Sequence, residues 1–316
     1  MTANFKDWVK VSGDSGNDNT KLILKLEDET YKTVSLPTMV ELSENKDGKN
    51  VAIYSSNRYI VGDETGYITD NQTDHDKAND IHKLSMITGL CNLLKNNGLE
   101  DTEKVLLTVN MPLNSFLNVD ERSKTEKLYN ERVSIKVNGT DFNFDLKVVL
   151  YFEGCGVINN HKNEIGEEPV ITMMLGSFNT SAITFNENGM PIKNQSKSIE
   201  YGIIELIAKV QNALLPVVGR TYSDVVVKRI IKGKKDGVDS KVFDITKQVV
   251  IEHLVGVRNQ LKRLGVELDV YKIIFAGGGA ILLEKYLKEV FGDNIVIDND
   301  PLFADAKGAL KFIEKK

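Results

Sequence analysis

The chain holds little cysteine, histidine or proline. Its 316 residues include two cysteines, four histidines and six prolines. The cysteines, Cys91 and Cys155, are too few for a disulfide framework, and the histidines show no zinc-ligand spacing with them. The sequence therefore argues against a disulfide-stabilised fold and against a zinc site.

Long hydrophobic runs are also missing. No apolar run reaches the roughly 18 residues that a membrane-spanning helix requires. Residues 1–8 lack the apolar centre of a secretory signal peptide. We therefore expect a cytoplasmic protein.

Positive charge is in slight deficit. The chain has 40 Lys and Arg against 45 Asp and Glu, for a net charge of −5, which disfavours direct, sequence-independent binding to nucleic acid. One basic cluster stands out at residues 228–235, Lys-Arg-Ile-Ile-Lys-Gly-Lys-Lys. It is either a solvated hairpin or loop or a partner site.

The rest of the composition is that of a soluble globular protein, with 41% hydrophobic and 27% charged residues. Apolar periodicity predicts strands followed by helices, twice along the chain. The first half is predicted to hold strands at 21–27, 51–54, 59–61 and 104–109 and a helix at 77–94. The second half is predicted to hold strands at 170–174, 182–185, 271–275 and 294–297 and helices at 199–215, 246–264, 281–291 and 303–313.

The strongest local signal is Asn138-Gly139 between two alternating runs at 133–137 and 142–146. This pattern predicts a β-hairpin, whose second arm continues to Glu153. A polar stretch at 159–168 then separates the two halves. We expect an α/β fold of two similar domains, residues 1–162 with a closing helix at 303–316 and residues 163–302, because strands and then helices recur.

A first candidate phosphate-binding segment runs from Asp14 to Lys21. Gly16 allows a turn and the close approach of a phosphate, Lys21 supplies positive charge, and Asp14 is a candidate magnesium ligand. The remaining candidate nucleotide-binding residues of this segment are Ser15, Asn17, Asn19 and Thr20. An ordinary polar β-turn between two strands has the same composition, so that alternative stays open.

Two further glycine-bearing segments follow in the second half. One lies between strand-like runs, and its candidate residues are Gly176, Ser177, Asn179 and Thr180; a plain hairpin is the alternative. The other follows a buried strand-like run and opens a helix, and its candidate residues are Gly277, Gly278, Gly279 and Ala280. Three glycines remove every Cβ from the path of a ligand, which a plain strand-to-helix turn rarely needs.

Glu153 ends the long hairpin arm, before Gly-Cys-Gly. A carboxylate at this position is able to orient water for attack on a γ-phosphate, and a surface glutamate at a strand end is the alternative.

Taken together and in this order, the segments resemble the actin and sugar-kinase superfamily of ATPases. Within it, the chain most resembles bacterial plasmid-segregation actins of the ParM type. Asp14, Gly16 and Lys21 match the phosphate-1 signature Asp-x-Gly-x-x-x-x-Lys, the Gly176 loop stands where phosphate-2 belongs, and residues 277–280 are similar to the adenosine motif. Glu153 falls where the family has its catalytic glutamate or glutamine. Residues 303–308 resemble the family's Phe-Ala-Asn-x-x-Gly helix.

This resemblance implies an actin-like fold with a nucleotide cleft between two domains, ATP or GTP with Mg²⁺ as cofactors, and hydrolysis coupled to filament assembly. It also implies self-association and an adaptor protein bound to a centromere-like DNA site, with no direct contact to nucleic acid or membrane. A small-molecule kinase of the same superfamily and a membrane-associated actin-like division protein are the alternatives.

One position departs from the family pattern. The phosphate-2 loop normally begins Asp-(Leu/Ile)-Gly-Gly-x-Thr, and its aspartate helps to order the magnesium waters. This chain has Met174 at that place, followed by Leu175-Gly176-Ser177-Phe178-Asn179. A thioether does not order metal-bound water, so Asp14 is expected to be the main acidic residue near the metal.

Overall fold

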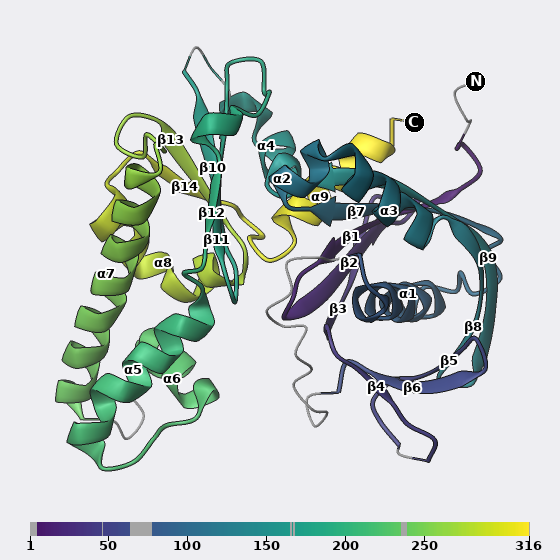
Figure 1. Ribbon diagram of the computed structural model, residues 1–316, viewed down its shortest axis with the longest axis horizontal. Helices are drawn as coiled ribbons and strands as arrows, with labels where there is room; N and C mark the ends of the chain where they lie inside the picture. The colour runs from purple at the N-terminus through teal and green to yellow at the C-terminus, as the bar shows by residue number, and fades with distance from the viewer. Residues whose placement is uncertain are drawn as a thin grey trace. The chain divides into compact units, whose positions relative to one another are not determined.

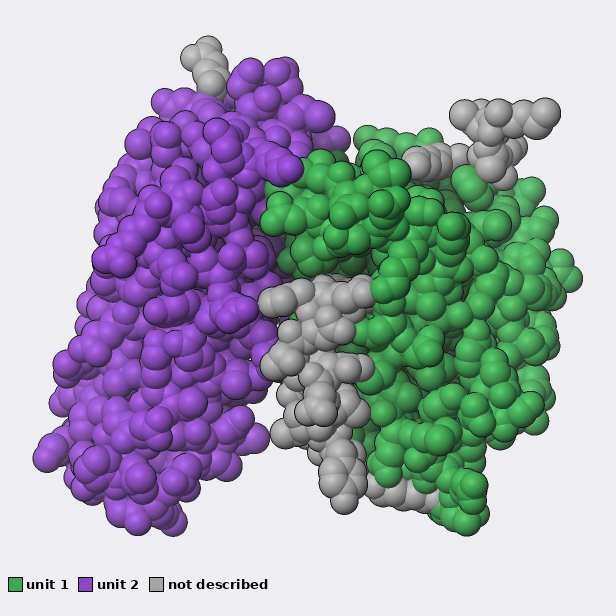
Figure 2. All heavy atoms as spheres, in the orientation of Figure 1, with its two compact units in different colours: residues 1–159, 305–316 green, residues 160–304 purple. Residues whose placement is uncertain are grey.

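The computed structural model describes residues 5–45, 47–63, 78–164, 166, 168–234 and 239–315. The chain divides into two compact units, coloured separately in Figure 2: unit 1 holds residues 1–159 and 305–316, and unit 2 holds residues 160–304. None of the helices in the described part of the chain is long and apolar enough to cross a membrane.

Unit 1 is built on one sheet, in which the described residues form nine strands in the order β3-β2-β1-β7-β9-β8-β5-β6-β4. Their bounds are β1 Val9–Ser15, β2 Asn19–Lys25, β3 Tyr31–Pro37, β4 Val40–Leu42, β5 Val51–Tyr54, β6 Asn57–Val61, β7 Lys104–Met111, β8 Glu131–Val137 and β9 Thr140–Phe152. The helices are α1 Asp80–Lys95, α2 Leu113–Leu117, α3 Val119–Tyr129, α4 Cys155–Asn160 and α9 Ala304–Ile313.

The sheet of unit 1 curves around α1 (Figure 1). Twelve of the sixteen residues of this helix are buried, among them Met86, Ile87 and Leu90. A helix surrounded in this way needs apolar residues on most of its circumference rather than on one stripe. The predicted helix start at residue 77 lies outside the described residues.

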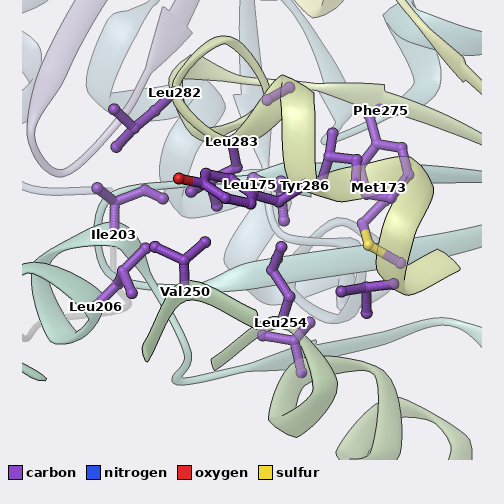
Figure 3. Packing of buried hydrophobic residues seen from close by; sticks show 14 of the residues in the cluster. Met173, Leu175, Ile203, Leu206, Val250, Leu254, Phe275, Leu282, Leu283 and Tyr286 are labelled. Atoms are coloured by element: carbon purple, nitrogen blue, oxygen red, sulfur yellow. The ribbon is translucent and has the colours of Figure 1, made fainter. Parts of the chain in front are cut away.

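Unit 2 is built on a smaller sheet, whose described strands follow the order β12-β11-β10-β13-β14. Their bounds are β10 Val170–Leu175, β11 Thr180–Phe185, β12 Lys197–Ile199, β13 Lys272–Ala276 and β14 Ile295–Ile297. The helices are α5 Ile203–Val218, α6 Asp224–Ile231, α7 Ser240–Arg263 and α8 Gly278–Phe291. Figure 3 shows how side chains of α5, α7 and α8 pack on the sheet residues Met173, Leu175 and Phe275.

The two sheets share one topology over five strands. In unit 1, β3-β2-β1 are antiparallel neighbours and β7 and β9 then add in parallel; in unit 2, β12-β11-β10 and then β13 and β14 do the same. The central hairpins also have the same register, because Ser15 pairs with Thr20 and Leu175 pairs with Thr180. The predicted α/β class with two similar halves is confirmed.

The predicted hairpin is confirmed as well. β8 and β9 are joined by Asn138 and Gly139, whose φ angles are 49° and 80°. Both residues thus adopt the left-handed conformation of a type I′ turn, which Asn-Gly accepts most readily. The predicted closing helix is α9, whose Leu310 and Ile313 are buried in the core of unit 1.

The interpretation of residues 228–235 as a hairpin or loop was wrong for its first half. Lys228 to Ile231 lie in α6, because Val227, Ile230 and Ile231 form a buried apolar face at helical spacing. The exposed side of this helix carries Lys228 and Arg229. Residue 235 lies outside the described part.

Helices α4 and α9 touch backbone to backbone in unit 1. A Cβ built on Gly156 would lie 1.7 Å from the carbonyl oxygen of Asp305, and one built on Gly308 would lie 1.8 Å from that of Gly156. No side chain fits at either position without separating the helices.

We therefore predict that Gly308→Ala lowers the free energy of unfolding by roughly 1–3 kcal/mol or more, because the methyl group overpacks this crossing. Gly166→Ala is the matched control, since a Cβ there meets nothing within 4 Å. Denaturant melts of both variants check the prediction, and equal stabilities would contradict the close crossing.

Candidate functional site

The candidate residues of unit 1 lie at the carboxyl end of the parallel strands of its sheet. Strands β1, β7 and β9 run in parallel, so their carboxyl ends meet there, which is where open α/β sheets bind ligands. Asp14 is the last but one residue of β1, and Glu153 directly follows β9. The backbone N–H of Glu153 donates to the carbonyl of Met111 at 2.9 Å, which fixes it beside the end of β7.

Asp14 is held from two sides. Lys21 Nζ lies 2.8 Å from its Oδ2, and Asn110 Nδ2 donates to its Oδ1 at 2.6 Å. Burial lowers the pKa of Lys21, but attraction to Asp14 and the hydrogen bond with it, followed by the charges of Asp305 and Asp18, raise the pKa above its usual value. Lys21 therefore keeps its positive charge at this edge.

The other residues of the first loop divide into two groups. Ser15 has internal partners for both its donors: its N–H donates to Asn110 Oδ1 at 2.8 Å, and its hydroxyl lies 2.6 Å from His82 Nδ1. Thr20 Oγ1 is 2.9 Å from Thr38 Oγ1. These two side chains thus help to hold the loop in place.

The first loop turns at Gly16, whose N–H donates to the carbonyl of Asn19 at 3.2 Å. A Cβ at Gly16 would lie 2.7 Å from that carbonyl oxygen, so the turn itself requires glycine. Asn19 Nδ2 donates to Asp18 Oδ2 at 2.8 Å. Asn17 Oδ1 is enclosed and has no hydrogen-bond partner among the described residues, so the tip of the loop holds an unused polar group.

The loop of unit 2 repeats this turn. Gly176 N–H donates to the carbonyl of Asn179 at 2.9 Å. Asn179 Nδ2 donates to Ser198 Oγ at 3.1 Å, and Thr180 Oγ1 donates to the carbonyl of Tyr201 at 2.6 Å. The loop therefore has the same backbone hydrogen bond as its counterpart, with different side-chain supports.

This second loop also covers the start of α5. The carbonyls of Gly176 and Ser177 accept from the N–H groups of Ile203 and Ile204 at 3.1 and 2.9 Å. Gly202 permits the contact, because a Cβ there would lie 2.2 Å from the carbonyl oxygen of Ser177. Two of the otherwise unpaired N–H groups at the helix start are satisfied in this way.

The glycine run lies next to the second loop within unit 2. Gly277 has φ 88°, and a Cβ on it would lie 2.7 Å from the carbonyl oxygen of Leu175. A Cβ built on Gly279 would lie 2.7 Å from Leu175 Cβ, and the next residue, Ala280, is buried. Only Gly278 has room for a side chain, with Leu302 at 3.8 Å. Packing on Leu175 thus explains Gly277 and Gly279 but not Gly278.

The shared register identifies the counterpart of Asp14 in unit 2. Asp14 pairs with Lys21 across β1 and β2, and Met174 pairs with Ser181 across β10 and β11. Each lies two residues before the loop glycine. The structure therefore places half-buried Met174, which has no charge, at the position that Asp14 occupies in unit 1.

Sequence reasoning missed Asn110 and Asp305. Asn110 lies at the end of a predicted strand, where a polar residue before Met-Pro was the available signal. Asp305 is 2% exposed, and its Oδ1 accepts from the N–H groups of Gly156 and Val157 at 2.8 and 3.3 Å. Its signal was the aspartate in Phe-Ala-Asp, where the resembling family has asparagine.

Burial, followed by the charges of Asp14 and Glu153, raises the pKa of Asp305 to about 8. Its Oδ2 is enclosed without a hydrogen-bond partner among the described residues. A lone buried carboxylate oxygen beside other carboxylates fits a cation as its missing partner. Within the described residues, no three histidine, cysteine, aspartate or glutamate side chains lie close enough to hold a metal ion by themselves. A magnesium ion that keeps waters and phosphate oxygens as ligands is compatible with this arrangement, with Asp14 and Asp305 as its protein carboxylates.

We predict that Asp305→Asn stabilises the ligand-free protein, and more so at pH 8 than at pH 5. The pKa of Asp305 in the folded protein, about 8, lies above its usual value of 3.8, so the native state binds the extra proton and the wild type loses stability as pH rises between these values. The gain should grow by at least about 1 kcal/mol over this interval. Denaturant melts at both pH values test this, with Asp298→Asn as a control that breaks the 2.8 Å pair with His161 and should destabilise. A pH-independent gain, or a loss, would contradict the proposed burial of charge.

Comparison with known proteins follows the same division of the chain. Residues 175–289 match the family model described as archaeal actin homologue MreB-like, C-terminal. This segment begins at the end of β10 and continues into α8. No curated protein matches the chain in sequence.

Several solved structures share the whole fold. A crystal structure of an archaeal actin homologue is 18% identical with a TM-score of 0.78, covering 98% of this chain and 100% of that one. The apo psk41 ParM protein is 17% identical with a TM-score of 0.74 and covers 98% of both chains. A 15-stranded ParM filament from Clostridium botulinum is 18% identical with a TM-score of 0.74, covering 98% of this chain and 100% of that one. The resemblance to actin-like proteins is thus confirmed: the chain has the actin-like fold over nearly its whole length.

Proposed function

We propose that this chain is a nucleotide-dependent, filament-forming ATPase of the actin type that segregates plasmid or phage DNA through an adaptor protein. The observation that carries the proposal is the doubled loop: two turns with the same Gly-to-Asn backbone hydrogen bond, in the same register of two sheets of the same topology. The fold is also that of a ParM filament and of an archaeal actin homologue solved in complex with ADP.

In this proposal each unit carries its own nucleotide-binding residues. Unit 1 binds phosphate through the first loop and Lys21, and Asp14 holds magnesium directly or through water. Unit 2 binds phosphate through residues 176–180 and the nucleoside through Gly278 and its neighbours. Packing does not require glycine at position 278, and the absence of a side chain there allows the nucleoside to approach closely. The base is either adenine or guanine.

Glu153 is the proposed water-orienting residue. The end of β9 and the hydrogen bond of its N–H to Met111 hold it at the same sheet edge as Asp14. Bound magnesium supplies charge neutralisation on the phosphates. Glu153 accepts a hydrogen bond from the attacking water and so aligns that water with the terminal phosphorus.

Assembly follows from a nucleotide that has different contacts in two states of the chain. Such a ligand shifts the population toward the state it binds more tightly. Contacts between unlike surfaces of successive copies propagate as open filaments rather than closed rings. The chain's net charge of −5 suits an indirect link to DNA through a separate adaptor, with the protein acting in the cytoplasm.

We predict that purified protein assembles on addition of ATP or GTP with magnesium, above a critical protein concentration. Light scattering and negative-stain microscopy measure assembly, and samples without nucleotide are the control. If no polymer forms across a wide range of salt and protein concentration, and a small molecule is phosphorylated instead, the kinase alternative replaces this proposal.

Glu153→Ala is expected to bind nucleotide and assemble like the wild type but to release phosphate at least about tenfold more slowly, a barrier increase of about 1.4 kcal/mol. Its filaments should persist longer, because hydrolysis is what weakens them. The matched control is Glu100→Ala, which removes an exposed glutamate of unit 1. Phosphate release at the wild-type rate would remove Glu153 from the mechanism.

A further inference from the structure

The structural role of Asp305 requires only one hydrogen-bond acceptor, but its carboxylate has two oxygens. Its Oδ1 caps the first turn of α4 by accepting from Gly156 and Val157. Asparagine caps helices as well as aspartate does. The second oxygen, Oδ2, is enclosed and has no partner within the described residues. Capping therefore leaves both the charge and the second oxygen unexplained.

Asp305 lies among other ionisable groups of unit 1. Its side chain is 2% exposed, and the carboxyl groups of Asp14 and Glu153 are near enough to interact with it. Lys21 places one positive charge near Asp14 and Asp305. The enclosed Oδ2 therefore lies at a position where a bound cation would be stabilised.

A divalent cation is the partner that this chemistry selects. Carboxylate oxygens are hard ligands that prefer magnesium or manganese, whereas a phosphate alone would be repelled by the same group. Since no three candidate ligands are close enough to hold a bare ion among the described residues, the cation should arrive with a nucleotide and its waters.

We infer that Asp305 is a metal-positioning residue of the nucleotide site, and that its free Oδ2 accepts a hydrogen bond from a water bound to the nucleotide's divalent cation. Asp305 thereby adds a second acidic group of unit 1 to that of Asp14. This inference rests on the proposed nucleotide function.

The test measures how much a divalent cation strengthens ADP binding. The dissociation constant of ADP is determined by calorimetry with Mn²⁺ and again with EDTA, for the wild type and for Asp305→Asn. The ratio of the two constants should fall at least about tenfold in the variant, equivalent to about 1.4 kcal/mol, while the constant in EDTA stays within about twofold of the wild type. The electron paramagnetic resonance signal of free Mn²⁺ gives an independent count of bound metal.

Two further variants are measured in the same way. Asp298→Asn alters another buried aspartate, which lies in unit 2 and pairs with His161, and it should leave the ratio unchanged. Asp305→Ser keeps a capping oxygen and removes the charge, so it should lower the ratio as Asp305→Asn does and covers the case in which the asparagine variant folds poorly.

Each outcome decides the inference. An unchanged ratio in both Asp305 variants, or an equal loss of ADP affinity with Mn²⁺ and with EDTA, would show that Asp305 is structural and overturn it while the nucleotide function stands. If the wild type binds ADP in neither condition, the proposed function fails and the inference fails with it.

Discussion

The candidate site depends on one backbone hydrogen bond that occurs twice, from a glycine N–H to an asparagine carbonyl three residues later. At Gly16 and at Gly176 this bond closes the turn between two antiparallel strands, and a side chain on either glycine would strike the accepting carbonyl. The turn fixes the register of the strands behind it. It therefore sets Asp14 and Met174 at equivalent positions and brings the parallel strands β7 and β13 beside them. In unit 1, β7 carries Asn110, whereas Glu153 follows β9 and Asp305 lies in α9.

The two units differ in charge around these equivalent turns. In unit 1, Asp14, Lys21, Glu153 and Asp305 place ionisable groups at a largely buried sheet edge. In unit 2, the corresponding strand end carries Met174 and the turn is supported by neutral hydrogen bonds to Ser198 and Tyr201. The two units thus share one topology, but the residues around the equivalent turns are charged in unit 1 and neutral in unit 2.

Close contacts require several glycines, among them Gly277 and Gly279, which were candidate nucleotide-binding residues in the sequence. Gly277 and Gly279 are required by Leu175, Gly202 by Ser177, and Gly156 by Asp305. Gly278 alone in the glycine run lacks such a neighbour. Only the neighbouring atoms therefore distinguish a glycine that packing requires from one that has room for a side chain.

The sequence by itself determined the elements whose cause is local. The Asn138-Gly139 hairpin follows from residues that accept positive φ, and the alternating strands and the order of the glycine-bearing turns follow from short-range patterns. From these, the α/β class and the resemblance to actins were predictable. Only the tertiary contacts decided that Ser15 is hydrogen-bonded to Asn110 and His82, and that Asp305 reaches the first turn of α4 from about half the chain away. Long-range pairing produces these two features, and it leaves no periodic trace in the residues that take part.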